Sequence, residues 1–332
     1  MINSRENILR TIQHKNPEWI PCPMVDGSIR IVSHSLKEFS QKHGEKDDWG
    51  VKWKTGEEIK GVGFPMKHPI STPEEVESYS LPDPDREGLM DSAKQEIENI
   101  DRSQSLVFGD NGWGIFERAW LLVGMEKLLK WMLKKPEVVE TLISRITEIK
   151  KRITERFIEE IDVGGIKYGD DWGREQALIM NPNLWRELIK PNQKKLYDVC
   201  NDNEVIVHQH TDGHIEDIIP DLIEIGLDIL NPLQPSCNDV EKIKSEFGRD
   251  ITFHGVVSSR VMDKGNPEEV KKEVKKRVNQ LDGNGGYILA PAHSVDYPKR
   301  NMDAFREAAK EYCKIPNRWM GEYQTDKVDV EV

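Results

Sequence analysis

The sequence has no long apolar run and no dense basic tract. No stretch approaches the roughly 20 apolar residues that a membrane-spanning helix needs, and residues 1–6 lack the apolar core of a signal peptide. The formal net charge is -12, and the densest basic cluster, residues 271–277, alternates with acidic and apolar positions as a solvated helix face does. Nucleic-acid binding needs a concentrated basic face. We therefore expect a cytoplasmic protein that binds neither membranes nor nucleic acid.

Cysteine is scarce, and nucleotide-binding glycine motifs are missing. The four cysteines form no C-x-x-C pair, which excludes a thiolate zinc knuckle and gives no sign of a disulfide framework. The sequence contains no G-x-G-x-x-G or P-loop motif, and the glycine-rich residues 283–286 precede a predicted strand, as a turn does. Any bound metal is therefore expected to use mainly nitrogen and oxygen ligands.

Short β-rich runs alternate with helical stretches along the chain. The predicted strands cover residues 19–25, 105–109, 164–168, 204–210, 227–231, 251–253 and 286–290. One helix is predicted from Pro136 to about Ile161, a second is capped by Asn183 and ends near Cys200, and a third begins at Pro267. This alternation is typical of βαβ units around a parallel sheet. We predict an α/β fold with one domain over residues 1–332, either a (β/α)8 barrel or an open doubly wound sheet.

A loop-rich excursion interrupts this alternation at about residues 49–85. It contains Trp49, Trp53, Phe64 and His68 in quick succession. Loops of this length are either functional or simple insertions. Two hypotheses stay open: the excursion caps the mouth of the barrel, or it is an ordinary packed insertion.

Polar residues follow several of the predicted strands. In residues 205–213, His208, His210 and Asp212 stand at alternate positions and would share one face of a strand, with apolar side chains on the other. The carboxyl ends of barrel strands converge at one mouth, so His254 and His293 would join them. Imidazole and carboxylate together suit zinc, with His210 and Asp212 as the natural pair, His208 deeper, and His293 closing the site. A hydrogen-bonded polar core or metal-free acid-base chemistry is the alternative.

Two further groups of residues belong to the predicted mouth. Asp170 and Asp171 point apart because they are adjacent; one would bond backbone amides and the other would meet substrate, metal or developing charge. An aromatic set lies near the strand ends and would either wall a flat substrate or pack in the core. Its members are Trp113, Phe116, Trp120 and Trp172.

Ordered motifs extend this interpretation to nearly the whole chain. They occupy residues 5–9, 48–51, 82–84, 169–173, 181–186, 210–213, 225–235, 253–255 and 285–293. Together they resemble the uroporphyrinogen decarboxylase superfamily and, within it, the cobamide-dependent methyltransferase-like branch. The resemblance implies a distorted (β/α)8 TIM barrel with a funnel at the carboxyl ends of its strands.

The resemblance also implies a zinc site with altered ligands. Methyltransferases of the family hold zinc with a histidine, a cysteine two residues later and a cysteine from a late strand. Here His210 matches the histidine, Asp212 replaces the first cysteine, and His293 stands near the place of the second. This set departs from the thiolate-rich ligation that suits thiol binding.

The implied activity is methyl transfer from a small methoxylated or methylated compound to a corrinoid on a partner protein. Zinc at His210, Asp212 and His293 would act as a Lewis acid on the departing oxygen. Asp171 or Asp170 would orient the substrate, and His208 or His254 would supply a proton. Substrate contacts are expected from Asn111, Trp113, Trp172 and Gln234.

Other functions and the oligomeric state stay open. The alternatives are a metal-free decarboxylase or lyase of a small carboxylic acid that uses Asp171 as charge stabiliser, a methylcobamide:thiol methyltransferase, and a non-catalytic binding protein. Porphyrin synthesis is not expected, because the segment that is arginine-rich in true decarboxylases, here residues 25–31, contains only Arg30. Aspartates in the funnel would also repel a polyanionic porphyrinogen. Residue types do not fix the oligomeric state, and a homodimer is compatible with them.

Overall fold

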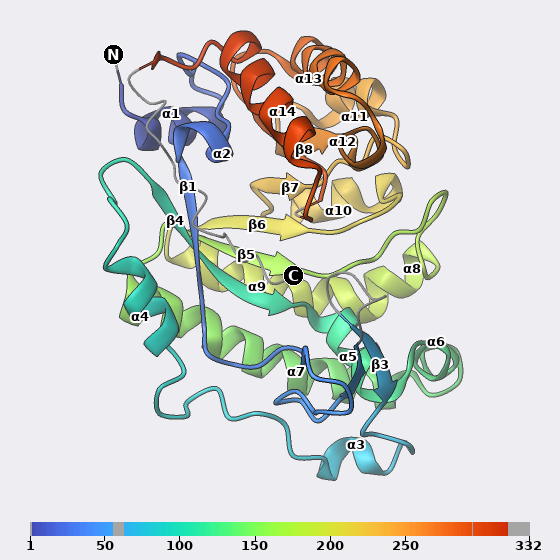
Figure 1. Cartoon of the computed structure of the whole chain (residues 1–332). Coiled ribbons are helices and arrows are strands. Elements are labelled where there is room, and N and C mark those ends of the chain that lie inside the picture. Colours follow the sequence, from blue (N-terminus) through green and yellow to red (C-terminus); the bar gives the residue numbers. More distant parts are fainter. Residues whose placement is uncertain (1, 56–62, 294, 318–332) are drawn as a thin grey trace.

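A curled parallel sheet forms the centre of the molecule in the computed structural model, which describes residues 2–55, 63–293 and 295–317 (Figure 1). Its seven strands lie in the order β1-β4-β5-β6-β7-β8-β9, and every neighbouring pair is parallel. The strands are β1 (Ile29–Ser33), β4 (Leu106–Trp113), β5 (Gly165–Gly169), β6 (Ile206–His210), β7 (Ile229–Asn231), β8 (Thr252–Val257) and β9 (Tyr287–Pro291). The predicted α/β fold of TIM-barrel type is confirmed.

Helices connect the strands and cover the outside of the sheet. In Figure 1, α7 and α9 lie on one side of the barrel and α11 to α14 on the other. The longer helices are α1 (Ser4–Ile12), α4 (Asp91–Ile97), α5 (Ile115–Val123), α6 (Met125–Lys134), α7 (Pro136–Arg156), α9 (Lys190–Asp202), α11 (Val240–Phe247), α13 (Pro267–Leu281) and α14 (Lys299–Tyr312). Shorter elements are α2 (Pro23–Asp26), α3 (Glu75–Ser78), α8 (Pro182–Leu184), α10 (Ile219–Glu224), α12 (Ser259–Lys264) and the turns η1 (Phe157–Ile161), η2 (Trp185–Ile189) and η3 (Glu216–Ile218).

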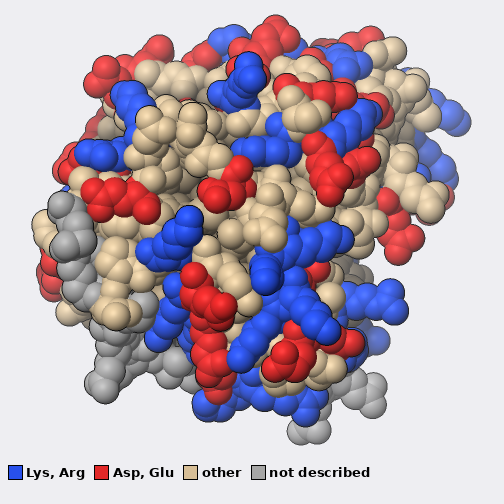
Figure 2. All heavy atoms as spheres, turned by 90° about the horizontal axis from the view of Figure 1, so that it is seen from above, with Lys and Arg blue, Asp and Glu red and all other residues tan. Residues whose placement is uncertain are grey.

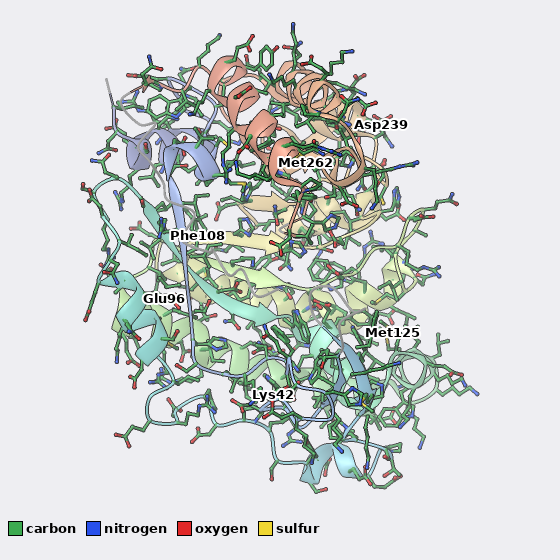
Figure 3. All side chains as sticks on the ribbon, in the orientation of Figure 1. Lys42, Glu96, Phe108, Met125, Asp239 and Met262 are labelled. Carbon is green, nitrogen blue, oxygen red and sulfur yellow. The ribbon has the colours of Figure 1, made fainter. Side chains whose placement is uncertain are left out.

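Strand alternation separates an apolar floor from a polar mouth inside the barrel. Ile8 and Ile12 of α1 pack with inward-facing strand residues such as Phe108, which is labelled in Figure 3. The other floor residues are Leu106, Ile229 and Ile288. Inward-facing positions recur every second residue along each strand. The strand registers therefore also decide which side chains face inward closer to the carboxyl ends. Helix α1 therefore closes the barrel at the amino-terminal ends of its strands. A functional site is expected at the carboxyl ends.

The predicted strand at residues 19–25 is wrong. Pro23 begins helix α2, and only the Pro21 carbonyl reaches the sheet, where it accepts a hydrogen bond of 2.8 Å from the Leu289 amide of β9. Proline cannot donate to a sheet ladder, so this segment follows β9 without pairing as a regular strand. The first strand is instead β1, which the sequence analysis missed.

Two of the three predicted helix starts are confirmed. Helix α7 begins at Pro136 and continues through η1 to Ile161, and α13 begins at Pro267 after an Asn266 capping box. The cap predicted at Asn183 is wrong, because the side chain of Asn181 accepts the hydrogen bond from the Asn183 amide at 2.8 Å. That cap starts α8, which continues through η2 into α9.

The excursion at residues 49–85 is packed against α5. It contains β2 (Lys52–Lys54) and β3 (Phe64–Lys67), which pair antiparallel, while its residues 56–62 lie outside the described residues. Trp49 and Trp53 are fully buried, and the guanidinium of Arg118 lies 4.6 Å from the Trp49 ring centre. The excursion is a packed insertion beside the end of β4, and a capping role stays a prediction.

The charges on the outer face are mixed. Seen from above Figure 1, Lys and Arg side chains alternate with Asp and Glu (Figure 2). In α13, Arg277 pairs with Glu273, and Lys271 pairs with Glu307 of α14. Lys272, Lys275 and Lys276 are exposed, as predicted for a solvated helix face at residues 271–277, whereas Arg277 is buried. In the part of the chain that the structure describes, no helix is both long and apolar enough to cross a membrane.

Candidate functional site

Two adjacent strand ends bring histidine and aspartate side chains together at the mouth. Gly169 of β5 pairs with His210 of β6, so the residues that follow them run side by side. The Asp170 amide donates to the His210 carbonyl at 3.0 Å, and the Gly173 amide donates to the Asp212 carbonyl at 3.2 Å. The loops after β5 and β6 are thereby held together across several residues.

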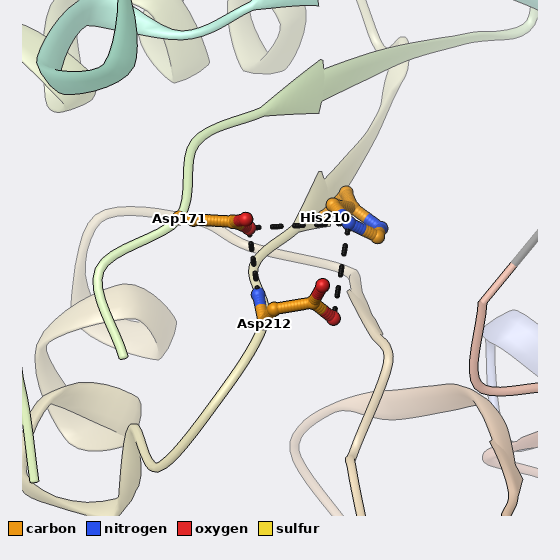
Figure 4. A group of neighbouring side chains, drawn as sticks. All are labelled: Asp171, His210 and Asp212. Carbon is orange, nitrogen blue, oxygen red and sulfur yellow. Dashed lines mark hydrogen bonds and ion pairs between the residues drawn. The ribbon is translucent and has the colours of Figure 1, made fainter. Parts of the chain in front are cut away.

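Asp171, His210 and Asp212 converge from these loops (Figure 4). The His210 Nε2 atom lies 3.9 Å from Asp171 Oδ1 and 4.0 Å from Asp212 Oδ1, and one ligand atom from each residue fits within 4.8 Å of the others. The Asp212 amide also donates to Asp171 Oδ1 at 2.8 Å. Three nitrogen and oxygen atoms thus face a common point, as metal ligands do.

The two carboxylates interact unfavourably in the absence of a cation. Burial raises the pKa of Asp171, and the charge of Asp212 raises it further, against the opposing effect of His210. Burial also acts to raise the pKa of Asp212, but a hydrogen bond from His293 and the charge of His210 bring it below its ordinary value. Asp212 Oδ1 is buried and has no hydrogen-bond partner among the described residues. A bound cation would satisfy this oxygen and reduce the repulsion.

His293 lies beside this triad and is bonded to one of its members. Its Nε2 atom lies 2.8 Å from Asp212 Oδ2, and its Nδ1 atom lies 2.7 Å from Ser259 Oγ. The hydroxyl of Tyr297 donates to Ser259 Oγ at 2.9 Å. The hydrogen bond to Asp212 raises the pKa of His293. Asp171 therefore completes the triad here, and ligation by His293 stays a prediction.

His208 and His254 form a pair one layer deeper in the barrel. His208 Nε2 lies 3.0 Å from His254 Nδ1. Burial lowers the pKa of His208 far below its ordinary value and lowers the pKa of His254 to about 4. The charge of Lys167, which pairs in register with His208 and donates to Asp110 Oδ2 at 3.0 Å, lowers both pKa values further. Both imidazoles are therefore neutral near pH 7.

Asp170 turns away from the triad and caps helix α5. Its two carboxylate oxygens accept hydrogen bonds from the amides of Phe116 at 2.9 Å and Glu117 at 2.7 Å. The prediction that one of the paired aspartates bonds backbone amides is thus confirmed, and Asp170 is the one that does so. Because Asp170 is fully buried, direct contact with a substrate is not available to it in this conformation.

Two of the four expected substrate contacts are also turned away from the mouth. The Asn111 amide donates to Thr154 Oγ1 at 2.8 Å and to a backbone carbonyl of α7, because its residue lies on the outer face of β4. Trp172 is fully buried, with its ring edge-on to Trp185 at 5.3 Å between ring centres. Core packing accounts for Trp172, as the alternative hypothesis for the aromatic set allowed, and hydrogen bonds to α7 account for Asn111.

The other two expected contacts remain near the mouth. Gln234 Oε1 accepts a hydrogen bond of 2.9 Å from the Gly213 amide and so fixes the loop that carries Asp212. Trp113 is half-buried and stacks on Phe39, with 6.0 Å between ring centres. A substrate contact by either residue stays a prediction.

Sequence reasoning missed Glu117 and Asn231. Burial raises the pKa of Glu117 well above its ordinary value, and the charges of Asp171 and Asp170 add to this effect. No local pattern marks Glu117, because its position depends on the Asp170 cap of α5. Asn231 had a usable signal, since it is a polar residue at the end of a predicted strand.

Asp170→Asn should change the pH dependence of stability. Burial raises the pKa of Asp170 from 3.8 to about 7. Because this pKa is raised in the folded state, ionisation of Asp170 destabilises the fold. The wild type therefore has its full stability with respect to this group below pH 4 and loses that contribution as the pH rises through 7. Asparagine does not ionise, so the variant does not show this pH-dependent loss. The difference in free energy of unfolding, variant minus wild type, should therefore increase by about 1 to 4 kcal/mol between pH 4 and pH 8. Urea unfolding at several pH values measures this, and parallel curves for the two proteins would refute it.

Gly213→Ala should disturb the loop that carries Asp212. Gly213 has a φ of +86°, and a Cβ there would lie 2.4 Å from the backbone of Gly173. Gly44 is a matched control, because it has a φ of +77° but no atom within 4 Å of the added Cβ. Both variants carry the cost of the left-handed conformation, about 1 kcal/mol. We expect Gly213→Ala to lose at least about 1 kcal/mol more, measured by urea unfolding. Equal losses would contradict the close approach of the two loops.

Comparisons with known proteins identify a family from one family model and support the fold from a solved structure. A family model described as uroporphyrinogen decarboxylase (URO-D) matches residues 39–312. No curated protein matches the sequence. Among solved structures, the chain is similar to a methyltransferase from Methanosarcina mazei at 17% identity, with a TM-score of 0.73 and coverage of 94% of this chain and 99% of that one. A Bacillus subtilis mannanase is similar at 12% identity, covers 94% of each chain, and has a TM-score of 0.45. The first of these structures supports the barrel fold.

Proposed function

The chain belongs to the uroporphyrinogen decarboxylase (URO-D) family, and on that basis we propose that it is a methyltransferase. It would move a methyl group from a small methoxylated or methylated compound to a corrinoid carried by a partner protein. The observation that carries this proposal is the convergence of Asp171, His210 and Asp212 at the barrel mouth. The fold shared with a methyltransferase from Methanosarcina mazei is compatible with it.

The residues present fit a zinc ion. Zn²⁺ accepts imidazole nitrogen and carboxylate oxygen ligands, and three protein ligands leave an open position when it is catalytic. Two observations support this fit: Asp212 Oδ1 is buried without a hydrogen-bond partner among the described residues, and burial raises the pKa of Asp171. When bound there, zinc supplies Lewis-acid stabilisation to the oxygen that loses its methyl group.

The chain's own residues orient the ligands and handle the proton. Gln234 and Asp171 hold the backbone amides of Gly213 and Asp212, which keeps the Asp212 loop in place. His254 and His208 are neutral and lie beneath the triad, where the N–H of a neutral imidazole would donate a hydrogen bond to a departing oxygen. Burial and the charge of Asp171 raise the pKa of Glu117 well above its ordinary value, so Glu117 would be the proton donor in this mechanism.

The barrel wall favours a small substrate over a porphyrinogen. Asp26 is buried and accepts hydrogen bonds from the Trp19 indole at 3.0 Å and the Ser28 amide at 3.0 Å. Ile31 follows Ile29 on the inward face of β1, and Arg30 lies on the opposite face. An apolar side chain thus stands where propionate recognition would need positive charge.

Free cob(I)alamin is a suitable acceptor for testing this proposal. Zinc-loaded protein would be incubated with cob(I)alamin and a panel of methanol, methylamines and methoxylated benzoates, and methylcobalamin would be followed by absorbance. We expect a rise with at least one donor that is absent with His210→Ala and retained with His43→Ala, an exposed histidine. Failure with all donors, or release of carbon dioxide from a small carboxylic acid without cobalamin, would overturn the proposal.

A further inference from the structure

Asn231 links His210 to the next strand through its side-chain amide. Asn231 ends β7 and pairs in register with His210 of β6. Its Oδ1 atom lies 2.8 Å from His210 Nδ1, and its Nδ2 atom donates to the His254 carbonyl at 3.1 Å. The amide therefore bridges two inward-facing histidine positions on β6 and β8.

The hydrogen bond to His254 fixes which end of the amide faces His210. A backbone carbonyl only accepts hydrogen bonds, so the NH₂ group of Asn231 must face His254. The opposite end is an oxygen that likewise only accepts. His210 Nδ1 must then carry a proton in order to bond it. In a neutral imidazole this leaves Nε2 without a proton.

This tautomer gives the Nε2 atom the properties of a metal ligand. Nε2 faces Asp171 Oδ1 at 3.9 Å and Asp212 Oδ1 at 4.0 Å. With a proton on Nε2, this atom would have no free lone pair and could not ligate a metal. With the proton on Nδ1, the Nε2 lone pair joins two carboxylate oxygens around one point. Partners of this kind orient ligating histidines and set their tautomer in metal sites.

We propose that Asn231 is a positioning residue that holds neutral His210 in the Nδ1–H tautomer and so keeps Nε2 available as a ligand. The metal part of this inference rests on the proposed function. The tautomer itself does not, because it follows from hydrogen bonds within the chain. Its measurement in metal-free protein therefore stands apart from any result with zinc.

The tautomer can be read by long-range ¹H–¹⁵N correlation NMR of metal-free protein labelled at histidine. The sample is held at a pH where the ring is neutral, and His210→Gln identifies the resonances by their loss. We expect a protonated Nδ1 and an unprotonated Nε2 for His210 in the wild type. A protonated Nε2 in the wild type would overturn the inference without any variant.

Two variants test whether Asn231 is the cause. Asn231→Leu keeps the side-chain size but has no acceptor, so we expect part or all of the His210 population to move to Nε2–H. Asn231→Asp restores an acceptor and should restore Nδ1–H. In competition with a chromophoric chelator, Asn231→Leu should bind zinc about 10- to 100-fold more weakly, and Asn231→Asp should recover most of that loss. An unchanged tautomer in folded Asn231→Leu would overturn the positioning role, whereas a wild type with Nδ1–H and no zinc affinity would count against the proposed function alone.

Discussion

Arg118→Met is expected to lower the free energy of unfolding by about 3 to 5 kcal/mol, as removal of one partner from a buried ion pair does. Arg118 is fully buried in α5. Its guanidinium lies 3.3 Å from Asp47 Oδ2, pairs with Glu38, and is placed between Trp49 and Trp113 at 4.6 and 5.2 Å from their ring centres. Methionine would fill much of the space but leave both carboxylates short of a charge partner.

The electrostatics of Glu38 explain why this loss is large. Burial acts to raise the pKa of Glu38, but the charges of Lys150 and Arg118 lower it to about 2. Glu38 is therefore ionised in the folded protein and depends on both cations. In the Arg118→Met variant, Glu38 would keep its ion pair with Lys150, whereas Asp47 would lose the cation that acts to lower its pKa.

Urea unfolding measures the effect, and Arg152→Met is the matched control. Arg152 lies on α7, is partly exposed, and pairs with the exposed carboxylates of Asp85 and Glu159. Exposed ion pairs contribute about 0 to 1 kcal/mol, so this variant should stay close to wild type. Similar small losses for both variants would show that the buried network does not hold the residue 49–85 excursion in place.

Asp171→Asn is expected to weaken zinc binding without lowering the free energy of unfolding of the metal-free protein. Loss of a direct ligand should weaken zinc binding by more than the roughly 100-fold that a change in a residue behind the ligands can cause. The pKa of Asp171 is raised by burial and by Asp212, so its charge is unfavourable without a cation. Its replacement should leave metal-free stability unchanged or raise it by about 1 kcal/mol.

Chelator competition and urea unfolding measure these two effects separately. Asp202→Asn, at an exposed position near the end of α9, serves as the control and should change neither. His293→Gln distinguishes the two possible ligand sets: a smaller loss of zinc affinity than in Asp171→Asn supports the triad, and a larger loss supports His293 as the third ligand. Undiminished zinc affinity in Asp171→Asn would remove this residue from the site.

Local pattern was enough to predict the fold and two of the three members of the triad. The alternation of β-rich and helical runs predicts parallel strands, and the spacing of His210 and Asp212 predicts their shared position at one strand end. For the third member, the sequence predicts that Asp170 or Asp171 meets substrate, metal or developing charge, but does not decide which of the two. Asp171 meets His210 because Gly169 and His210 pair in register, and register depends on packing between strands rather than on either segment alone.

The errors have related physical causes. The segment at residues 19–25 has the apolar content of a strand, but proline at positions 21 and 23 removes the donors that a strand needs. Asn111 follows the predicted strand 105–109 but lies within β4, and Trp172 follows β5; both side chains pack away from the mouth. Proximity in sequence to a strand end therefore locates the mouth but does not decide which face a side chain takes.

Anomalous diffraction at the zinc absorption edge from crystals grown with zinc would test the proposed metal site most directly. We expect one strong peak at the barrel mouth, within about 2.0 to 2.2 Å of His210 Nε2 and of carboxylate oxygens of Asp171 and Asp212. A peak at another position, or none within bonding distance of His210 at full zinc loading, would contradict the proposed metal site.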